Sequence, residues 1–476
     1  MLQKHLILEI SKHLGFAPTE GQQRLIEGLA SFCVTPGEGN ECLLVKGYAG
    51  TGKTSTMAAF VQTLSQLKQN VVLLAPTGRA AKVLREYAGH AASTIHKCIY
   101  RQKSSSDGMG QFEINYNKHQ HTIFIVDEAS MLSNSGAESN AFGSGCLLAD
   151  LVEFVTQGNG CRLIFVGDTA QLPPIGTTLS PALSDSELRY YGLDPTEFTL
   201  TEVIRQHSES GILHNATMLR LQLDENRITT PQFRTNGFTD IKRISGAELL
   251  ECLEEAYARD GRHENTVICY SNKRANLYNK GVRTSILGID EELCAGDLLM
   301  VARNSYFWTE QVKELNLGFI ANGDIVEIVR LSKHHEQHGF RFVDATIRLI
   351  DSNNAELDVR LMLDTLTVDG PSLGADDMKR LYLSVAEDYA HISTKKQRIE
   401  QIKADPFYNA IQVKFAYAVT CHKAQGGQWR NVFVDQGFFR SEMLNKEYLR
   451  WLYTAITRAS GQLFLVNFKE EFFESM

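Results

Sequence analysis

The stretch Gly47–Thr54, with the sequence GYAGTGKT, constrains the fold of this chain more than any other segment. It matches a phosphate-binding loop, in which a glycine and four residues of any type precede Gly-Lys-Ser/Thr. The apolar run 42–45 before it predicts a buried parallel strand, and apolar residues at helical spacing after it predict a helix. A strand, a glycine loop and a helix N-terminus form an anion site, because the loop's N–H groups face phosphate oxygens. The predicted loop contacts are Gly47, Ala49, Gly50, Thr51, Gly52, Lys53 and Thr54.

Two carboxylates follow a second buried run. Residues 123–126 are typical of a strand, and Asp127 and Glu128 come directly after it. In phosphate-loop ATPases the first such carboxylate holds Mg²⁺, and the second polarises the attacking water. The loop lysine reaches the β- and γ-phosphates, and the loop threonine ligates the metal. We therefore expect ATP and Mg²⁺ as cofactors, with Lys53 on the phosphates, Thr54 and Asp127 on the metal and Glu128 as the base.

Polar groups also follow two other predicted strands. Thr77 and Arg79 come after the apolar run 71–75, at the carboxyl end of its strand, where open α/β sheets bind ligands. They are candidates for contacts to nucleic-acid phosphates, although an ordinary strand–helix corner has the same sequence pattern. Gln171 follows the apolar run 163–166 and is a candidate sensor of the γ-phosphate.

The rest of the chain predicts a second α/β unit and two insertions. This second unit lacks a phosphate loop; its expected strands are at 267–269, 411–417, 432–434 and 463–466. Alternating segments around a Ser/Asp/Gly turn predict a β-hairpin at about 98–121, inserted in the first unit. Short alternating strands between about 296 and 350 predict a small β-barrel inserted in the second unit.

Two polar segments near the barrel invite a functional interpretation that the sequence does not support. His334, His335 and His338 fall in a predicted turn of the barrel, where no cysteine or carboxylate cluster completes a metal site. Residues from about 375 to 404 are typical of charged helix. The Lys395–Arg398 run within them is more typical of a solvated face than of a nucleic-acid site.

Composition limits the classes of partner. The net charge of −8 over 476 residues provides no global basic field, so any nucleic-acid site must be a local groove. The nine cysteines are scattered and contain no Cys-x-x-Cys pair, which favours reduced thiols in the cytoplasm over disulfides or structural zinc. The N-terminus is not typical of a signal peptide, and no apolar run approaches the ~20 residues of a membrane span. We therefore expect a cytoplasmic protein with no membrane partner.

In order along the chain, these motifs resemble those of the superfamily-one DNA helicases of the RecD and Dda type, the subclass that moves 5′ to 3′. The resemblance extends from near residue 19 to 459, over nearly the whole chain. The matching stretches are Thr19–Gln22, Gly47–Thr54, Ala75–Lys82, Thr94–His96, Asp127–Met131, Gly167–Pro174, Ile204–Gln206, Thr420–Gly426 and Tyr453–Ala459.

The resemblance implies an α/β fold with two RecA-like parallel-sheet motor domains and an ATP site between them. The first domain would span 1–200, with the hairpin insertion acting as a strand-separating pin. The second would span 201–296 and 410–476, and residues 297–409 would form an inserted SH3-like β-domain with the charged helical segment.

The resemblance also implies residue roles. Gln22 would contact the adenine edge, and Gln171 would couple the nucleotide state to DNA. Arg205 and Arg458 would be arginine fingers from the second domain, which stabilise charge on the γ-phosphoryl group. The single-strand channel would be lined by Thr77, Thr94, His96, Thr420, His422 and Lys423, with Arg79 as a further DNA contact.

The implied activity is that of an ATP-dependent helicase, a monomeric motor that steps along single-stranded DNA and unwinds duplex forks. One alternative is a phosphate-loop ATPase that acts as a switch or remodeller, with little stimulation by single strands. Another is a nucleic-acid-binding protein with a vestigial ATPase, which the intact Lys53, Asp127, Glu128, Arg205 and Arg458 argue against. A small-molecule kinase would have no need of the second α/β unit.

Overall fold

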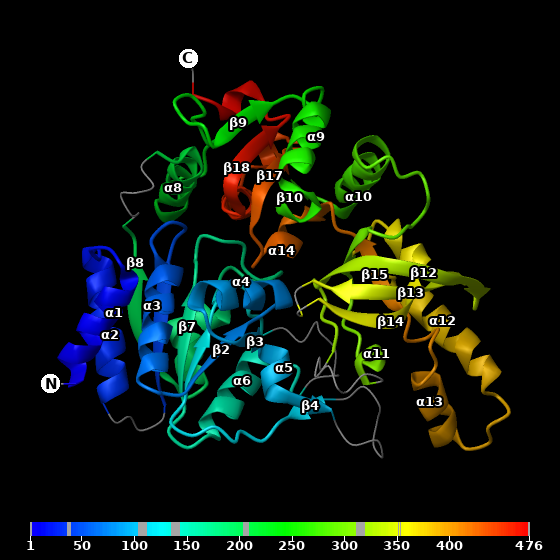
Figure 1. The fold of residues 1–476 in the computed structure, drawn as a ribbon, viewed down its shortest axis with the longest axis horizontal. Helices are drawn as coiled ribbons and strands as arrows, with labels where there is room; N and C mark the ends of the chain where they lie inside the picture. The colour runs from blue at the N-terminus through cyan, green and yellow to red at the C-terminus, as the bar shows by residue number, and fades with distance from the viewer. Residues whose placement is uncertain are drawn as a thin grey trace.

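The structure is a computed structural model that describes residues 2–35, 40–102, 112–134, 143–202, 209–310, 319–350, 352 and 354–474. Figure 1 shows two sheet units, one carrying the N-terminus and one carrying the C-terminus, with a β-barrel beside them. Both predicted α/β units and the predicted barrel are therefore present.

The first sheet is six-stranded and entirely parallel, and β1 precedes the phosphate loop. Its strands, in spatial order, are β3 (Ala92–Thr94), β2 (Val71–Ala75), β6 (Ile123–Val126), β7 (Arg162–Gly167), β1 (Glu41–Gly47) and β8 (Asp194–Leu200). The accompanying helices are α1 (Leu2–Leu14), α2 (Glu20–Val34), α3 (Lys53–Gln66), α4 (Gly78–Ala88), α5 (Ile95–Ile99), α6 (Leu147–Thr156) and α7 (Asp185–Tyr190).

The apolar runs in this sheet bury both of their faces. Along β1, Leu43 and Val45 belong to a core cluster that contains residues of α1, α2 and α3. Cys42 and Leu44 point to the other face and belong to a cluster that contains residues of α6. Helices on both faces explain why the strand sequences are continuously apolar rather than alternating.

The second sheet is five-stranded and also parallel. Its strands, in spatial order, are β16 (Ala418–Thr420), β10 (Asn265–Cys269), β17 (Trp429–Asp435), β18 (Ala459–Val466) and β9 (Ile241–Ile244). Its helices are α8 (Gly211–Asp224), α9 (Leu249–Asp260), α10 (Asn272–Gly281), α14 (Cys421–Ala424) and α15 (Lys446–Ile456). The α/β fold with a parallel-sheet core is thus confirmed.

The barrel is closed by five strands: β11 (Leu298–Val301), β12 (Ile325–Gln337), β13 (Phe340–Leu349), β14 (Ala355–Met362) and β15 (Ile411–Phe415). The prediction for β15 was wrong: the sequence assigned it to the second sheet, but it pairs with β11 and β14. Two of the three histidines were also misplaced, because His334 and His335 lie within β12 rather than in a turn. No group of three or more metal-ligating side chains occurs among the described residues.

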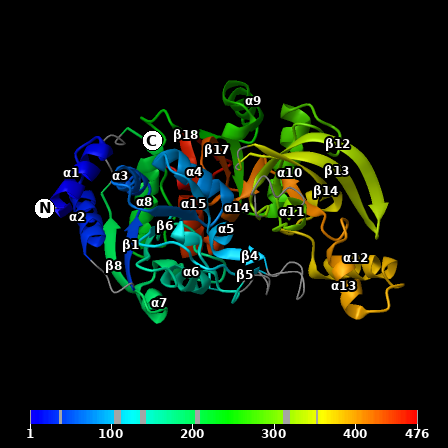
Figure 2. The ribbon, with the colours of Figure 1, turned by 60° about the horizontal axis from the view of Figure 1, so that its bottom comes forward.

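Two smaller features adjoin the barrel. The charged segment near 375–404 is helical, as predicted, and forms α12 (Ala375–Asp388) and α13 (Lys395–Lys403), seen beyond the barrel in Figure 1. The strands β4 (Tyr100–Gln102) and β5 (Phe112–Ile114) pair antiparallel, while the predicted turn between them lies outside the described residues. Figure 2 shows β4 and β5 on the side of the first sheet unit that is nearer the barrel and its short helix α11 (Phe307–Glu310). Within the described part of the chain, no helix has the length and apolar character needed to cross a membrane.

Candidate functional site

Polar side chains of the phosphate loop form hydrogen bonds within the loop in this structure. Gly50 and Gly52 have φ angles of 75° and 78°, a left-handed conformation that glycine adopts without strain. Lys53 starts α3, and its Nζ donates to the Tyr48 carbonyl at 2.9 Å. The Thr51 hydroxyl donates to the same carbonyl at 2.8 Å. The N-terminal amides of α3, the Lys53 ammonium and the Thr54 hydroxyl therefore offer the groups that a nucleotide triphosphate needs.

The carboxylate pair lies at the end of β6, as predicted. Asp127 accepts a 2.8 Å hydrogen bond from the backbone N–H of Glu128, whose own backbone is left-handed, with a φ of 52°. Burial and then the neighbouring Glu128 carboxylate raise the pKa of Asp127 to about 6. Two carboxylates that repel one another at a partly buried site fit a divalent cation, which would neutralise both.

Arg458, which comes from the second sheet unit, lies next to this carboxylate pair. Arg458 is buried, at 4% relative exposure, and its Nη1 lies 3.8 Å from Oε1 of Glu128. It also donates to the carbonyl oxygens of Thr454 and Gly427. The structure thus places one predicted finger next to the predicted base, whereas Arg205 lies outside the described residues.

The two predicted glutamines are both buried at this site. Gln22 donates from Nε2 to the Thr51 carbonyl at 3.1 Å and accepts at Oε1 from the Thr19 N–H at 3.0 Å. Its carboxamide therefore holds the phosphate loop against the start of α2, and its contact with adenine stays a prediction. Gln171 lies in the loop after β7, and its Oε1 has no hydrogen-bond partner among the residues that the structure describes.

Sequence reasoning missed three residues of the second unit that bind the first. The Tyr453 hydroxyl accepts from the Ala49 N–H at 2.8 Å and donates to Asp168 at 2.7 Å. The Thr454 hydroxyl accepts from the backbone N–H of Leu172 at 2.8 Å. Gln425 donates to the Leu172 carbonyl at 2.7 Å. All three occur within the matched motifs, but only their contacts show which loops they hold.

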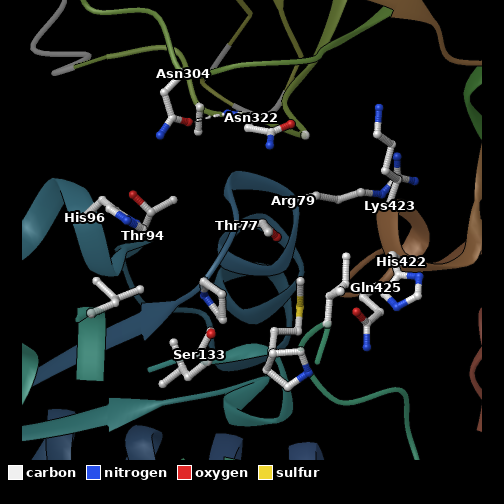
Figure 3. Close-up of a pocket in the computed structure, with 18 of the residues that line it drawn as sticks. Thr77, Arg79, Thr94, His96, Ser133, Asn304, Asn322, His422, Lys423 and Gln425 are labelled. Carbon is white, nitrogen blue, oxygen red and sulfur yellow. Dashed lines mark hydrogen bonds between the residues drawn. The ribbon is translucent and has the colours of Figure 1, made fainter. Parts of the chain in front are cut away.

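A cavity of about 460 Å³ lies between the two sheet units and the barrel. Figure 3 shows its labelled side chains arriving from all three parts. Among the predicted DNA-binding residues, the lining contains Thr77, Arg79, Thr94, His96, His422 and Lys423, while Thr420 is absent from it and precedes α14 as its N-cap. The predicted nucleic-acid residues therefore converge on one channel, with one exception.

The electrostatics of the channel suit an anionic ligand. Burial lowers the pKa values of His422 and Lys423, and the Glu447 carboxylate offsets only part of this effect at His422. The Arg79 guanidinium stacks on the Trp429 ring, with Cζ 3.8 Å from the ring centroid, and donates to the Gln428 carbonyl. A phosphate backbone would restore favourable interactions for the buried cations.

The barrel supplies lining residues that no sequence pattern indicated. Asn304, Phe319 and Asn322 come from barrel loops and face the cavity. The backbone N–H of Asn322 donates to Oδ1 of Asn304 at 2.6 Å, which fixes the two loops relative to each other. Only the tertiary arrangement brings these loops over the first sheet.

An aromatic series joins the β4–β5 pair to the barrel. The Phe112 ring lies 4.4 Å from Tyr306, and Tyr306 lies 5.1 Å from Phe319. Near the same strands, Tyr100 is buried and donates to Asp150 at 2.6 Å, whereas Tyr116 is 66% exposed. Tyr100 and Phe112 therefore serve packing, and Tyr116 is the ring that solvent reaches.

Comparisons with known proteins match this chain to two family models and to several DNA helicases. A family model described as an AAA domain matches residues 19–229, and one described as a UvrD-like helicase C-terminal domain matches residues 415–466. The chain is 32% identical to the ATP-dependent RecD2 DNA helicase of Deinococcus radiodurans over 181 residues, which are 37% of this chain and 21% of that protein. It is 24% identical to the ATP-dependent DNA helicase dda of Enterobacteria phage T4 over 60% of this chain and 62% of that one.

Two matches extend over most of both chains. An uncharacterized mimivirus protein, R530, is 22% identical over 88% of this chain and 93% of its own. A Bacteroides Pif1 helicase solved with ADP-AlF3 and single-stranded DNA aligns over 97% of this chain and 95% of its own, with 15% identity and a TM-score of 0.46. The two family models and the RecD2 and Dda matches support the resemblance of this chain to the superfamily-one DNA helicases of the RecD and Dda type.

Proposed function

We propose that this protein is an ATP-dependent translocase on single-stranded DNA that moves 5′ to 3′ and unwinds duplex forks. The observation that carries the proposal is the approach of Arg458, from the second sheet unit, to within 3.8 Å of Glu128 in the first. A nucleotide site completed by both units can sense and drive their relative movement. The same two units, with the barrel, enclose the channel.

The residues of the nucleotide site divide the chemistry between them. Lys53 would hold the β- and γ-phosphates, and Thr54 and Asp127 would hold Mg²⁺. When bound, ATP would supply the phosphoryl group whose transfer to water releases the free energy for movement, and Mg²⁺ would neutralise charge on the phosphate oxygens. Glu128 would orient the water and hold its proton at a carboxylate oxygen, while Arg458, with Arg205 as a second finger, would stabilise charge on the phosphoryl oxygens.

We further propose a division of the chain into parts with separate roles. Residues 1–200 would form the first RecA-like motor domain, and 201–296 with the segment after β15 would form the second. The barrel would be an SH3-like domain that covers the DNA channel with Asn304 and Asn322. The hairpin at about 98–121 would be the pin that separates strands, supported by the barrel through the Phe112–Tyr306 contact.

The first test is the rate of ATP hydrolysis with and without single-stranded DNA. Strong stimulation is expected, because the channel and the nucleotide site share the loop after β7. Turnover that single strands leave unchanged would instead support a switch or remodeller.

Direction is tested with duplexes that carry a single-stranded tail on one side, at low salt, because phosphate contacts weaken as salt rises. A 5′ tail should support unwinding that depends on ATP and Mg²⁺, and a 3′ tail or a blunt end should not. Equal unwinding from a 3′ tail would refute the polarity and leave the helicase activity in place.

A further inference from the structure

The outer edge of the phosphate loop is built into the second sheet unit. Tyr48 and Ala49, at the second and third positions of the loop, pack against the apolar core that contains the second sheet. In the general pattern these positions accept any residue, so phosphate binding alone does not explain a tyrosine there. The role of the Tyr48 side chain must therefore be inferred from its own contacts.

The Tyr48 side chain is held by two residues of α8. Its hydroxyl donates to both carboxylate oxygens of Asp224, at 3.0 and 3.2 Å. The Arg220 guanidinium lies over the ring, with Cζ 4.6 Å from the ring centroid. Burial and the Asp224 carboxylate raise the pKa of Tyr48 to about 12, so the hydroxyl stays protonated and remains a donor at neutral pH.

Arg220 is itself held in place for this contact. Its side chain is largely buried, at 9% relative exposure, and Nη1 donates to the Thr201 carbonyl at 2.8 Å. Within the described part of the chain, its Nε has no hydrogen-bond partner. A buried guanidinium stacked on an aromatic face is a stronger contact than an exposed one, because less water competes for the charge.

The backbone of Tyr48 points the other way, into the nucleotide site. Its carbonyl accepts from Nζ of Lys53 at 2.9 Å and from the hydroxyl of Thr51 at 2.8 Å. Lys53 must leave this carbonyl to serve the phosphates of a bound nucleotide. One residue thus joins α8 of the second unit, through its side chain, to the phosphate-binding lysine, through its carbonyl.

We propose that Tyr48, held by Asp224 and Arg220, is a positioning residue that couples nucleotide binding to the placement of the second sheet unit. This inference rests on the proposed function, because it assumes that the loop binds ATP and that the units move. The Tyr48–α8 contact stabilises the form in which Lys53 is held by the loop. A contact made in only one of two forms shifts their populations by its own free energy.

The consequence is a defined change in nucleotide affinity. Removing the Tyr48 hydroxyl in Tyr48→Phe should tighten the binding of a fluorescent ADP by about two- to tenfold, the range expected for one hydrogen bond. The effect of a single-stranded oligonucleotide on ADP affinity should shrink. By linkage, the effect of ADP on oligonucleotide affinity must shrink by the same factor.

The experiment measures ADP and oligonucleotide dissociation constants, each with and without the other ligand, on the full chain. Asp224→Ala, which removes the acceptor, should reproduce the result of Tyr48→Phe, and the double variant should add nothing, because both changes remove the same hydrogen bond. Tyr190→Phe is the matched control, since this tyrosine is 81% exposed and lies outside the nucleotide site. Its constants should equal those of the wild-type protein.

Three results would overturn the inference. Unchanged ADP affinity and unchanged coupling in Tyr48→Phe would show that the hydroxyl does not bias the two forms. Weaker ADP binding would show that Tyr48 holds the loop in its binding form instead. Absence of ADP binding by the wild-type protein would refute the proposed function itself, and the inference with it.

Discussion

Replacing Asp127 by asparagine should stabilise the nucleotide-free protein while abolishing its activity. Its carboxyl has a pKa raised from 3.8 to about 6, so the folded protein binds this proton more tightly than the unfolded chain does. Ionised Asp127 is therefore unfavourable for folding, by an amount that is absent below pH 3.8, grows through this interval and is complete above about pH 6. The upper bound at neutral pH is roughly 3 kcal/mol, at 1.36 kcal/mol for each pKa unit.

The measured gain should be smaller than this bound. Asp127 is half-buried rather than fully enclosed, so water screens part of the repulsion from Glu128, and we expect a gain of about 1–2 kcal/mol. The asparagine side chain can still accept the hydrogen bond that the Glu128 N–H now donates to Asp127. The loss of Mg²⁺-dependent ATP hydrolysis should be near complete, because the proposed metal ligand is gone.

The assay is urea unfolding of Asp127→Asn and of the wild-type protein, without nucleotide, at about pH 4 and pH 7.5. The variant should be the more stable at pH 7.5, and the difference should vanish near pH 4. Millimolar Mg²⁺ should narrow the difference at pH 7.5, because the cation offsets the same repulsion in the wild-type protein. If the variant is no more stable than the wild-type protein at pH 7.5, the reasoning is refuted, because ionised Asp127 would then not destabilise the folded protein.

The remaining predictions concern turnover and unwinding. Glu128→Gln should keep ATP and DNA binding and lose hydrolysis in a single-turnover assay, and near-normal turnover would exclude Glu128 as the base. Lys53→Ala should lose both tight nucleotide binding and turnover, measured by equilibrium binding and phosphate release; retained affinity would contradict its phosphate role. Arg458→Ala should lower DNA-stimulated turnover by ~10³ with little change in ATP affinity, because a finger acts mainly in the transition state; the reverse pattern would contradict this. Replacing Ser104–Gly110 with a minimal turn should abolish unwinding of a tailed duplex but keep DNA-stimulated hydrolysis, and loss of both would mean that the hairpin is structural.

Local sequence patterns were sufficient to predict an element where a single segment determines both its secondary structure and its ligand-binding groups. The apolar run before Gly47 and the helix from Lys53 are fixed by burial and by loop chemistry within a few residues. The antiparallel pairing of Tyr100–Gln102 with Phe112–Ile114 agrees with the predicted alternating segments, although the turn between them lies outside the described residues. Asp127 could be predicted because a buried strand that ends in carboxylates places them at the ligand-binding edge of a parallel sheet.

Sequence patterns did not predict where a segment packs when it suits two structural environments equally well. Ile411–Phe415 is a short apolar strand that suits a parallel sheet or a barrel equally well, and only its tertiary partners decide between them. His334 and His335 were assigned to a turn because the far half of β12 is polar and largely exposed, without the alternation that marks a strand. Asn304 and Asn322 carry no motif, since their position over the channel depends on how the whole barrel is placed.

Helix α15 connects the phosphate loop, the loop after β7 and the carboxylate pair, so these parts of the first unit can act together. Four side chains at helical spacing along it, or just beyond its end, reach the first unit: Arg450 contacts the Thr169 and Thr178 carbonyls, Tyr453 contacts Ala49 and Asp168, Thr454 contacts Leu172, and Arg458 approaches Glu128. A helix moves as a rigid body, so a change at any one of these contacts displaces the others. The loop after β7 extends this set to the channel, because the Leu172 carbonyl is bound by Gln425, which also lines the cavity. A shift of α15 caused by nucleotide would therefore reach the proposed DNA channel through a single intervening loop.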